Sequence, residues 1–228
     1  MISAKEILRR LRERYRLDVD GFVAPRALKR GASPFEVLVG IVLSQNTSDL
    51  NAIKAFESLR RLLGGEIEPR KILELSDEEL ATAIKPAGQQ RRRARVIKEL
   101  ARFFESNPQF VEELRGLDVE EARRKLLELP GVGPKTADVF LLMYLRKPTF
   151  PIDTHISRVA KRLGLGESYE EVRKRVLELA RDLSVDELIE LHLLLIQHGR
   201  ETCRPRNPRC SECVLSDVCA YRGGKYAL

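Results

Sequence analysis

The sequence predicts an all-α protein. Apolar residues recur at helical spacing along most of its 228 residues, and no alternating run is long enough to suggest a sheet. A Ser-x-x-Glu pattern, which is typical of a helix start, occurs four times: Ser33/Glu36, Ser76/Glu79, Ser168/Glu171 and Ser184/Glu187. We expect about ten helices in close succession, with no internal repeat and no long linker.

These patterns predict the helices in order along the chain. The first helix carries its apolar face at Ile7, Leu8 and Leu11. Pro34 suits the first position of the helix behind Ser33, because an N–H at that position has no partner within a helix. One helix over 121–129, with Asp118 as its start, and an apolar helix over 137–145 flank a glycine-rich turn. Later apolar faces are Ile156, Val159 and Ala160, and Val172, Val176 and Leu179.

Length and charge limit the classes of protein that fit. A chain of this length can bury one good core or two modest ones. A net charge of +7 and a pI of about 9.4 favour a polyanionic partner, with nucleic acid as the first candidate. The longest apolar run, 139–145, is too short to cross a bilayer, and residues 1–10 have no signal-peptide core. We therefore expect a cytoplasmic, nucleoid-associated protein without membrane contact, whose thiols stay reduced.

Residues 129–135 read Leu-Pro-Gly-Val-Gly-Pro-Lys and predict a helical hairpin. Pro130 ends the first helix, because proline lacks an N–H and disfavours helix in the residue before it. Gly131 and Gly133 are expected to adopt backbone conformations that other residues avoid. The turn would present its N–H groups, at Gly131, Val132 and Gly133, to a phosphate.

Lys135 is expected at the N-terminus of the second helix of this hairpin. The positive potential there favours a neutral amine, which could attack a sugar carbon and form a Schiff base. A lysine that only contacts phosphate fits the hairpin equally well. Asp153 follows eighteen positions later. It is a good N-cap for the helix after it and could also assist an amine nucleophile.

All four cysteines lie within seventeen residues, spaced C-x6-C-x2-C-x5-C. Four thiolates in one loop can surround a metal centre, and this spacing alone fits a structural zinc or an iron–sulfur cluster; two disulfides are the other alternative. Three arginines on the proline-stiffened loop between the first two cysteines could clamp phosphate. The cysteines are Cys203, Cys210, Cys213 and Cys219, and the arginines are Arg204, Arg206 and Arg209.

Four other features have a structural and a functional interpretation. His155 and Arg158 could contact DNA or fix the local fold. His192, on an apolar helix, is expected to be structural. His198 before Gly199 is expected at a helix C-terminus. The basic run at Arg91, Arg92, Arg93, Arg95 and Lys98 is expected to be a solvated face that would add nonspecific affinity beside a DNA groove.

Three features follow one another along the chain. The first is the hairpin with its lysine, the second is the motif Ile152-Asp153-Thr154-His155-Ile156-Ser157-Arg158, and the third is the cysteine loop. Together they resemble the endonuclease III family of helix-hairpin-helix DNA glycosylases. The likeness extends from about Pro34 to Cys219 and includes 43–49, Leu-Ser-Gln-Asn-Thr-Ser-Asp. A lone helical hairpin would indicate only DNA binding, whereas the combination is specific.

The resemblance implies a two-lobed all-α fold with a C-terminal 4Fe-4S cluster loop. One lobe would be a six-helix barrel over 27–147, and the other would combine 1–26 with 148–228. The four cysteines would hold the cluster, which favours it over zinc. The enzyme would act as a monomer on double-stranded DNA, flip a damaged base out of the stack and displace it with Lys135, assisted by Asp153. A Schiff base would permit β-elimination 3′ to the abasic site, and oxidised pyrimidines would be the substrates.

Two departures from the family pattern affect the expected DNA contacts. Many relatives have glutamine where the motif places Asn46, and Gln45 precedes it, so either side chain could fill the gap left by the flipped base. Relatives also tend to carry an apolar or aromatic pair where this chain has Gln89-Gln90, so stacking in the duplex would be weaker here.

Two other functions fit part of the sequence. A monofunctional thymine or uracil mismatch glycosylase would use the same cysteine loop, but Lys135 argues against it. A noncatalytic DNA-binding module fits every feature except the combination of Lys135 with Asp153.

Overall fold

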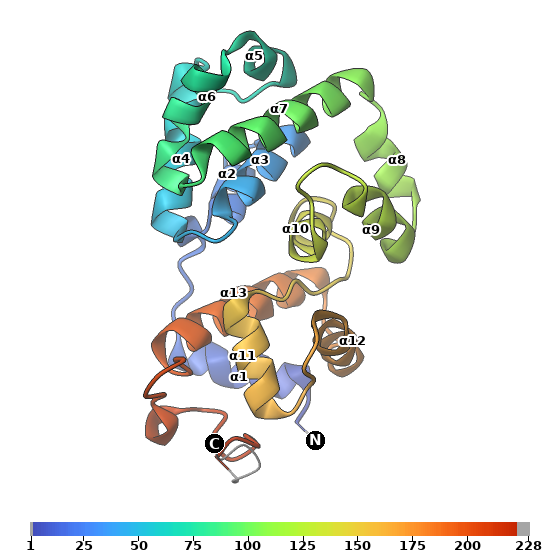
Figure 1. Cartoon of the computed structure of the whole chain (residues 1–228). Helices are drawn as coiled ribbons and strands as arrows, with labels where there is room; N and C mark the ends of the chain where they lie inside the picture. The colour runs from blue at the N-terminus through green and yellow to red at the C-terminus, as the bar shows by residue number, and fades with distance from the viewer. Residues whose placement is uncertain (1, 223–228) are drawn as a thin grey trace. The chain divides into compact units, whose positions relative to one another are not determined.

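The computed structural model describes residues 2–222, and every regular element within this range is a helix (Figure 1). The predicted all-α class is confirmed. The described range contains thirteen α-helices, more than the sequence predicts. Several have only six or seven residues, such as α5 (Pro69–Glu74) and α6 (Asp77–Ala83), which is too short to show a clear apolar period. None of the helices in this range is long and apolar enough to cross a membrane.

Contacts between residues divide the chain into two units. Unit 2 is continuous and spans Asp18–Arg146, whereas unit 1 combines the segments before and after it. Unit 2 begins earlier than residue 27, where the resemblance places the boundary. The reason is that α2 (Val23–Lys29) packs on α3 (Pro34–Ser44) and α4 (Asp49–Leu62).

The core of unit 2 forms around α3, in which nine of eleven residues are buried. A helix that is apolar on all sides needs neighbours all round it. Those neighbours include α2, α4 and α7 (Gln90–Ser106). The other helical elements of the unit are the 3-10 turns Val19–Gly21 and Lys85–Ala87, α8 (Phe110–Gly116), α9 (Val119–Leu127) and α10 (Pro134–Val139), which continues into a π-helical turn at Phe140–Tyr144.

Three of the four expected capping boxes are complete. They start at Ser76, Ser168 and Ser184, where the serine side chain and the glutamate side chain each accept a backbone N–H. At Ser33 only half of the box forms, and the prediction is wrong for Glu36. This glutamate is buried and pairs with Arg60, whose Nε lies 2.9 Å from its Oε1. Desolvation raises the pKa of the Glu36 carboxyl.

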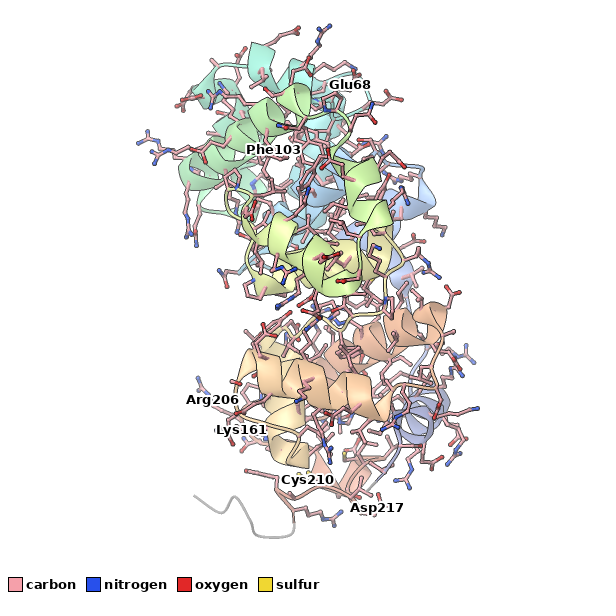
Figure 2. The ribbon with its side chains drawn as sticks, turned by 90° about the vertical axis from the view of Figure 1, so that its right-hand side faces the viewer. Glu68, Phe103, Lys161, Arg206, Cys210 and Asp217 are labelled. Atoms are coloured by element: carbon pink, nitrogen blue, oxygen red, sulfur yellow. The ribbon has the colours of Figure 1, made fainter. Side chains whose placement is uncertain are left out.

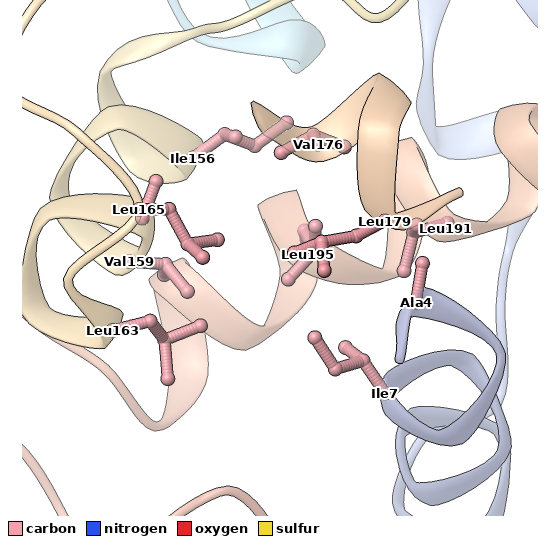
Figure 3. A pocket seen from close by; sticks show the side chains of 11 residues that line it. Ala4, Ile7, Ile156, Val159, Leu163, Leu165, Val176, Leu179, Leu191 and Leu195 are labelled. Carbon is pink, nitrogen blue, oxygen red and sulfur yellow. The ribbon is translucent and has the colours of Figure 1, made fainter. Parts of the chain in front are cut away.

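Unit 1 contains α1 (Ala4–Arg14), α11 (Thr154–Leu163), α12 (Tyr169–Leu179) and α13 (Val185–Glu201). The predicted apolar face of α1 is buried, and α1 packs on α13. Figure 3 shows a small cavity among these helices that is lined only by apolar side chains, among them Ile7, Ile156 and Leu195. Since no polar group faces it, this space is part of the core.

The helix α13 ends at Glu201, so His198 lies in its last turn as expected, but Gly199 is inside the helix and a cap there is wrong. A Cβ on Gly199 would lie 2.8 Å from Cβ of His155 on α11. Glycine is therefore needed for the close approach of the two helices and not for a cap. His192 is structural as predicted: it is buried, and its Nδ1 lies 3.1 Å from the carbonyl of Pro151.

Candidate functional site

The predicted helical hairpin is present between α9 and α10. Leu129 and Val132 are buried, and the Val132 N–H donates to the Leu129 carbonyl at 3.2 Å. Gly131 has a φ of +70°, and a Cβ there would lie 2.4 Å from Cγ1 of Val96. The turn therefore requires glycine at 131 for its backbone conformation and for its contact with α7.

The second glycine of the hairpin has a different role from the one expected. Gly133 is the N-cap of α10, with φ −95° and ψ −179°, which any residue can adopt. A Cβ on Gly133 would meet no atom within 4 Å. Its backbone consequently faces open space at a helix N-terminus, which is where an anion can approach the N–H groups.

Lys135 is the second residue of α10 and is half-buried, so the predicted position at the helix N-terminus is confirmed. A buried ion pair that the sequence analysis missed joins the two helices of the hairpin. Nε of Arg123 on α9 lies 3.1 Å from Oδ1 and 3.2 Å from Oδ2 of Asp138 on α10. The only signal in the sequence is a charged residue in the middle of an apolar helix.

Asp153 belongs to unit 1 and is the N-cap of α11, as predicted. Its Oδ1 accepts the N–H of Ile156 at 2.7 Å. The cap fixes one oxygen of a carboxylate that is otherwise half-exposed.

His155 and Arg158 connect the start of α11 to the start of the cysteine loop. Nη2 of Arg158 lies 3.2 Å from Nδ1 of His155 and donates to the Gly199 carbonyl at 2.8 Å. Its Nε donates to the Cys203 carbonyl at 2.9 Å. Burial lowers the pKa of His155, although the Asp153 charge raises it. These contacts give His155 and Arg158 a structural role; a DNA contact by His155 stays a prediction.

Gln45 contacts the hairpin with its side chain. Its Nε2 donates to the Gly131 carbonyl and to Oγ1 of Thr136, each at 3.0 Å. The neighbouring Asn46 is exposed, with a left-handed φ of +50°. Of the two candidates for the gap in the duplex, Asn46 is thus the exposed one and Gln45 is engaged with the protein.

The second predicted wedge lies where α7 begins. Gln89 is exposed and has a φ of +47°, directly after Gly88 with a φ of +73°. Gln90 is the first residue of α7 and is half-buried. Two exposed residues of unit 2, Asn46 and Gln89, therefore share an unusual left-handed backbone.

The basic run on α7 is not a uniformly solvated face, because Arg93 is buried. Its guanidinium donates to four backbone carbonyls, those of Val42, Gln45, Ala87 and Gly88. Burial lowers the pKa of Arg93, and the charge of Arg92 lowers it further. An arginine nevertheless stays protonated at neutral pH.

The four cysteines line one cavity in unit 1 and form no disulfide among the described residues. Their sulfurs receive hydrogen-bond donors: Arg162 Nη1 lies 3.2 Å from Cys203 Sγ, and the Leu215 N–H lies 3.4 Å from Cys213 Sγ. Nε2 of His198, whose Nδ1 contacts the Tyr15 hydroxyl at 2.9 Å, lies 3.7 Å from Cys213 Sγ. Donors of this kind stabilise thiolates, so the residues fit a cluster held by four cysteines.

Within residues 2–222, no three His, Cys, Asp or Glu side chains are placed to hold a single metal ion.

The three arginines of the cysteine loop differ in exposure. Arg206 and Arg209 are exposed, and Arg206 lies at the surface of unit 1 (Figure 2). Arg204 is half-buried, and its Nη2 donates to the Asn207 carbonyl at 3.3 Å. Arg204 therefore shapes the loop, and the other two are free to meet a phosphate.

Comparison with known proteins agrees with these features. The family of HhH-GPD base excision DNA repair proteins matches residues 39–182, and the iron–sulfur binding domain of endonuclease III matches residues 203–219. Endonuclease III of Sulfolobus acidocaldarius is 37% identical over 224 residues, covering 97% of each chain.

Solved structures of related proteins share the fold. A non-covalent complex of endonuclease III with DNA superposes with a TM-score of 0.68 at 27% identity, covering 99% of each chain. A thermostable thymine-DNA glycosylase superposes with a TM-score of 0.71 at 25% identity, covering 96% of this chain and 94% of that one. The chain therefore belongs to the HhH-GPD superfamily of base excision DNA repair proteins, as a DNA glycosylase and AP lyase of the endonuclease III type with a 4Fe-4S cluster loop.

Proposed function

We propose that the enzyme removes oxidised pyrimidines from double-stranded DNA, with Lys135 as the nucleophile, and also cleaves existing abasic sites. The observation that carries this proposal is the position of Lys135 in the first turn of α10, directly behind the hairpin. The hairpin backbone would bind a phosphate and so place the deoxyribose near the amine.

Lys135 would act in two stages. Its amine forms a bond to C1′ of the sugar while the N-glycosidic bond breaks, and the base leaves with the bonding electrons and takes up a proton. The ring then opens to a Schiff base, which makes the C2′ proton acidic. Loss of that proton breaks the C3′–O bond and releases the strand on the 3′ side.

Asp153 would assist this chemistry from the N-terminus of α11. Its Oδ1 is held by the Ile156 N–H, so Oδ2 is the oxygen offered to the substrate. A carboxylate held in one orientation can stabilise positive charge that develops on the sugar, or take a proton from the attacking amine.

The 4Fe-4S cluster would be held by Cys203, Cys210, Cys213 and Cys219 and would supply structure, not chemistry, to the reaction. It would order the loop that presents Arg206 and Arg209 to the DNA backbone. We expect a single chain to suffice for activity, and we expect the enzyme to act in the cytoplasm at the nucleoid, where its substrate lies.

Borohydride trapping tests the role of Lys135. Wild-type protein should become covalently linked to duplexes that contain an abasic site or an oxidised pyrimidine. Lys135→Ala should bind these duplexes but should neither be trapped nor cleave them. Lys125→Ala is the matched control, because Lys125 lies on α9 and pairs with Glu113 at 3.0 Å. Unchanged trapping in Lys135→Ala would refute the proposal.

A monofunctional thymine glycosylase is the second candidate, favoured by the similarity to the thermostable thymine-DNA glycosylase. Such an enzyme would release thymine or uracil from mismatches without cleaving the strand. Base release with no Schiff base trapping in the wild type would favour this candidate over the first.

A further inference from the structure

We propose that Arg93 is a positioning residue that holds the two wedge loops of unit 2 in the geometry needed to extrude a base. The wedge loops are the residues around Asn46, after α3, and the residues around Gln89, before α7. This inference rests on the proposed function, because it assigns a mechanical step within base excision.

The Arg93 guanidinium connects these two loops directly. It bonds to the carbonyls of Val42 and Gln45 on one side, and to those of Ala87 and Gly88 on the other. The four acceptors come from segments about 40 residues apart in the sequence. A planar guanidinium with five donors can bind several fixed acceptors at once.

The bonded carbonyls stand next to the two strained residues. Gln45 immediately precedes Asn46, and Gly88 immediately precedes Gln89. Both Asn46 and Gln89 have left-handed backbones, at φ values of +50° and +47°. Such conformations are strained and persist only where the surroundings impose them. Arg93 binds the carbonyl that directly precedes each of these two exposed residues.

Gln45 extends the same network to the hairpin. Its carbonyl is bound by Arg93, while its side chain donates to the Gly131 carbonyl and to Thr136. One buried cation thus links both wedge loops to the segment that carries Lys135. The wedge and the nucleophile would keep a fixed distance within unit 2.

The hydrogen-bond partners of Arg93 show that it does not form a stabilising ion pair. Within residues 2–222, no carboxylate pairs with Arg93, and all its partners are main-chain carbonyls of the wedge loops and of the end of α3. A buried charge without a counter-ion costs stability, so a fold selected for stability alone would not retain it. Its carbonyl partners fix backbone geometry instead.

The test compares Arg93→Lys and Arg93→Met with Arg102→Met in the complete, cluster-containing protein. Arg102 is an exposed arginine on the same helix, so this control loses the same charge. A lysine keeps the charge of Arg93 but offers a single donor group that cannot span both loops. Single-turnover rates are measured on two duplexes, one with thymine glycol and one with a preformed abasic site.

We expect base release from thymine glycol to fall on the order of 10²-fold in both Arg93 variants, because the extruded geometry is lost. Strand cleavage at the preformed abasic site should fall much less, because no base remains to be extruded. Hydrogen exchange at the amides of Gln45 and Gly88, which donate to the carbonyls of Val42 and Lys85, should accelerate in Arg93→Lys, while exchange at the core residue Leu38 stays unchanged.

Equal losses on both duplexes in Arg93→Lys, or unchanged exchange at the wedge loops, would overturn the role of Arg93. If the wild type cleaves neither duplex, the proposed function fails instead. The hydrogen-exchange result still decides whether Arg93 holds the loops, so the two failures are distinguishable.

Discussion

The hairpin at 129–135 and the cysteine loop at 203–219 are ordered by different means. The hairpin is fixed by its own protein contacts: Leu129 and Val132 are buried, and the Arg123–Asp138 pair joins its helices. The cysteine loop buries only Leu215 in its whole length, and the sulfur atoms of Cys203 and Cys213 receive donors from Arg162 and Leu215. We therefore expect the hairpin to fold with the helical core and the cysteine loop to need its cluster.

Removing the cluster should affect only the second segment. In Cys213→Ala we expect loss of iron and sulfide, because one of four ligands is gone and structural metal sites contribute on the order of 10 kcal/mol. Hydrogen exchange should then become fast across 203–219 and remain slow in α9 and α10. Ser211→Ala, an exposed change in the same loop, should retain iron. Equal loss of protection in the hairpin would contradict the distinction.

Breaking the buried ion pair should affect only the first segment. Asp138→Ala removes the charge opposite the buried Arg123 and should lower the free energy of unfolding by about 3–5 kcal/mol. The double variant Arg123→Met/Asp138→Leu should recover much of this loss, since apolar replacement of a buried pair is often tolerated. Urea denaturation measures both. An unchanged iron content in all variants would separate this effect from the cluster.

Substitutions of the two hairpin glycines should have the smallest effects, and they should distinguish a role in folding from a role in DNA binding. Gly131→Ala should destabilise by about 1–3 kcal/mol, because of its positive φ and the clash with Val96. Gly133→Ala should cost less, about 0.5–1 kcal/mol, which is the preference for glycine over alanine at an N-cap. It should nevertheless weaken binding to an abasic-site duplex, because a methyl group would stand before the exposed N–H groups. Fluorescence anisotropy measures that binding, and equal affinity in Gly133→Ala would contradict a phosphate site there.

Local chemistry explains what the sequence predicts correctly. The hairpin, the Asp153 cap and the gathering of the four cysteines around one cavity each depend on residues close together in the chain. The conformation of residues 130–135 is determined locally, because proline restricts the backbone and glycine frees it wherever they occur.

The sequence fails where a partner is distant. Arg93 was expected in solvent, but the Val42 carbonyl that it binds is 51 residues away. Glu36 pairs with Arg60 and does not complete its capping box. Position 199 is a glycine inside a helix because His155 packs closely against it. A charged residue or a glycine in the sequence does not indicate which helix will pack against it in the fold.

Unit 1 is built from two segments that are separated in the sequence by unit 2, and this affects how the protein folds during translation. The ribosome completes the continuous unit 2 once residue 146 has been made, and that unit can fold while translation proceeds. The apolar face of α1, although translated before unit 2, lacks its partner α13 until residues 185–201 emerge. This helix is thus among the last to be buried, and a nascent chain exposes Ile7, Leu8 and Leu11 until α13 emerges.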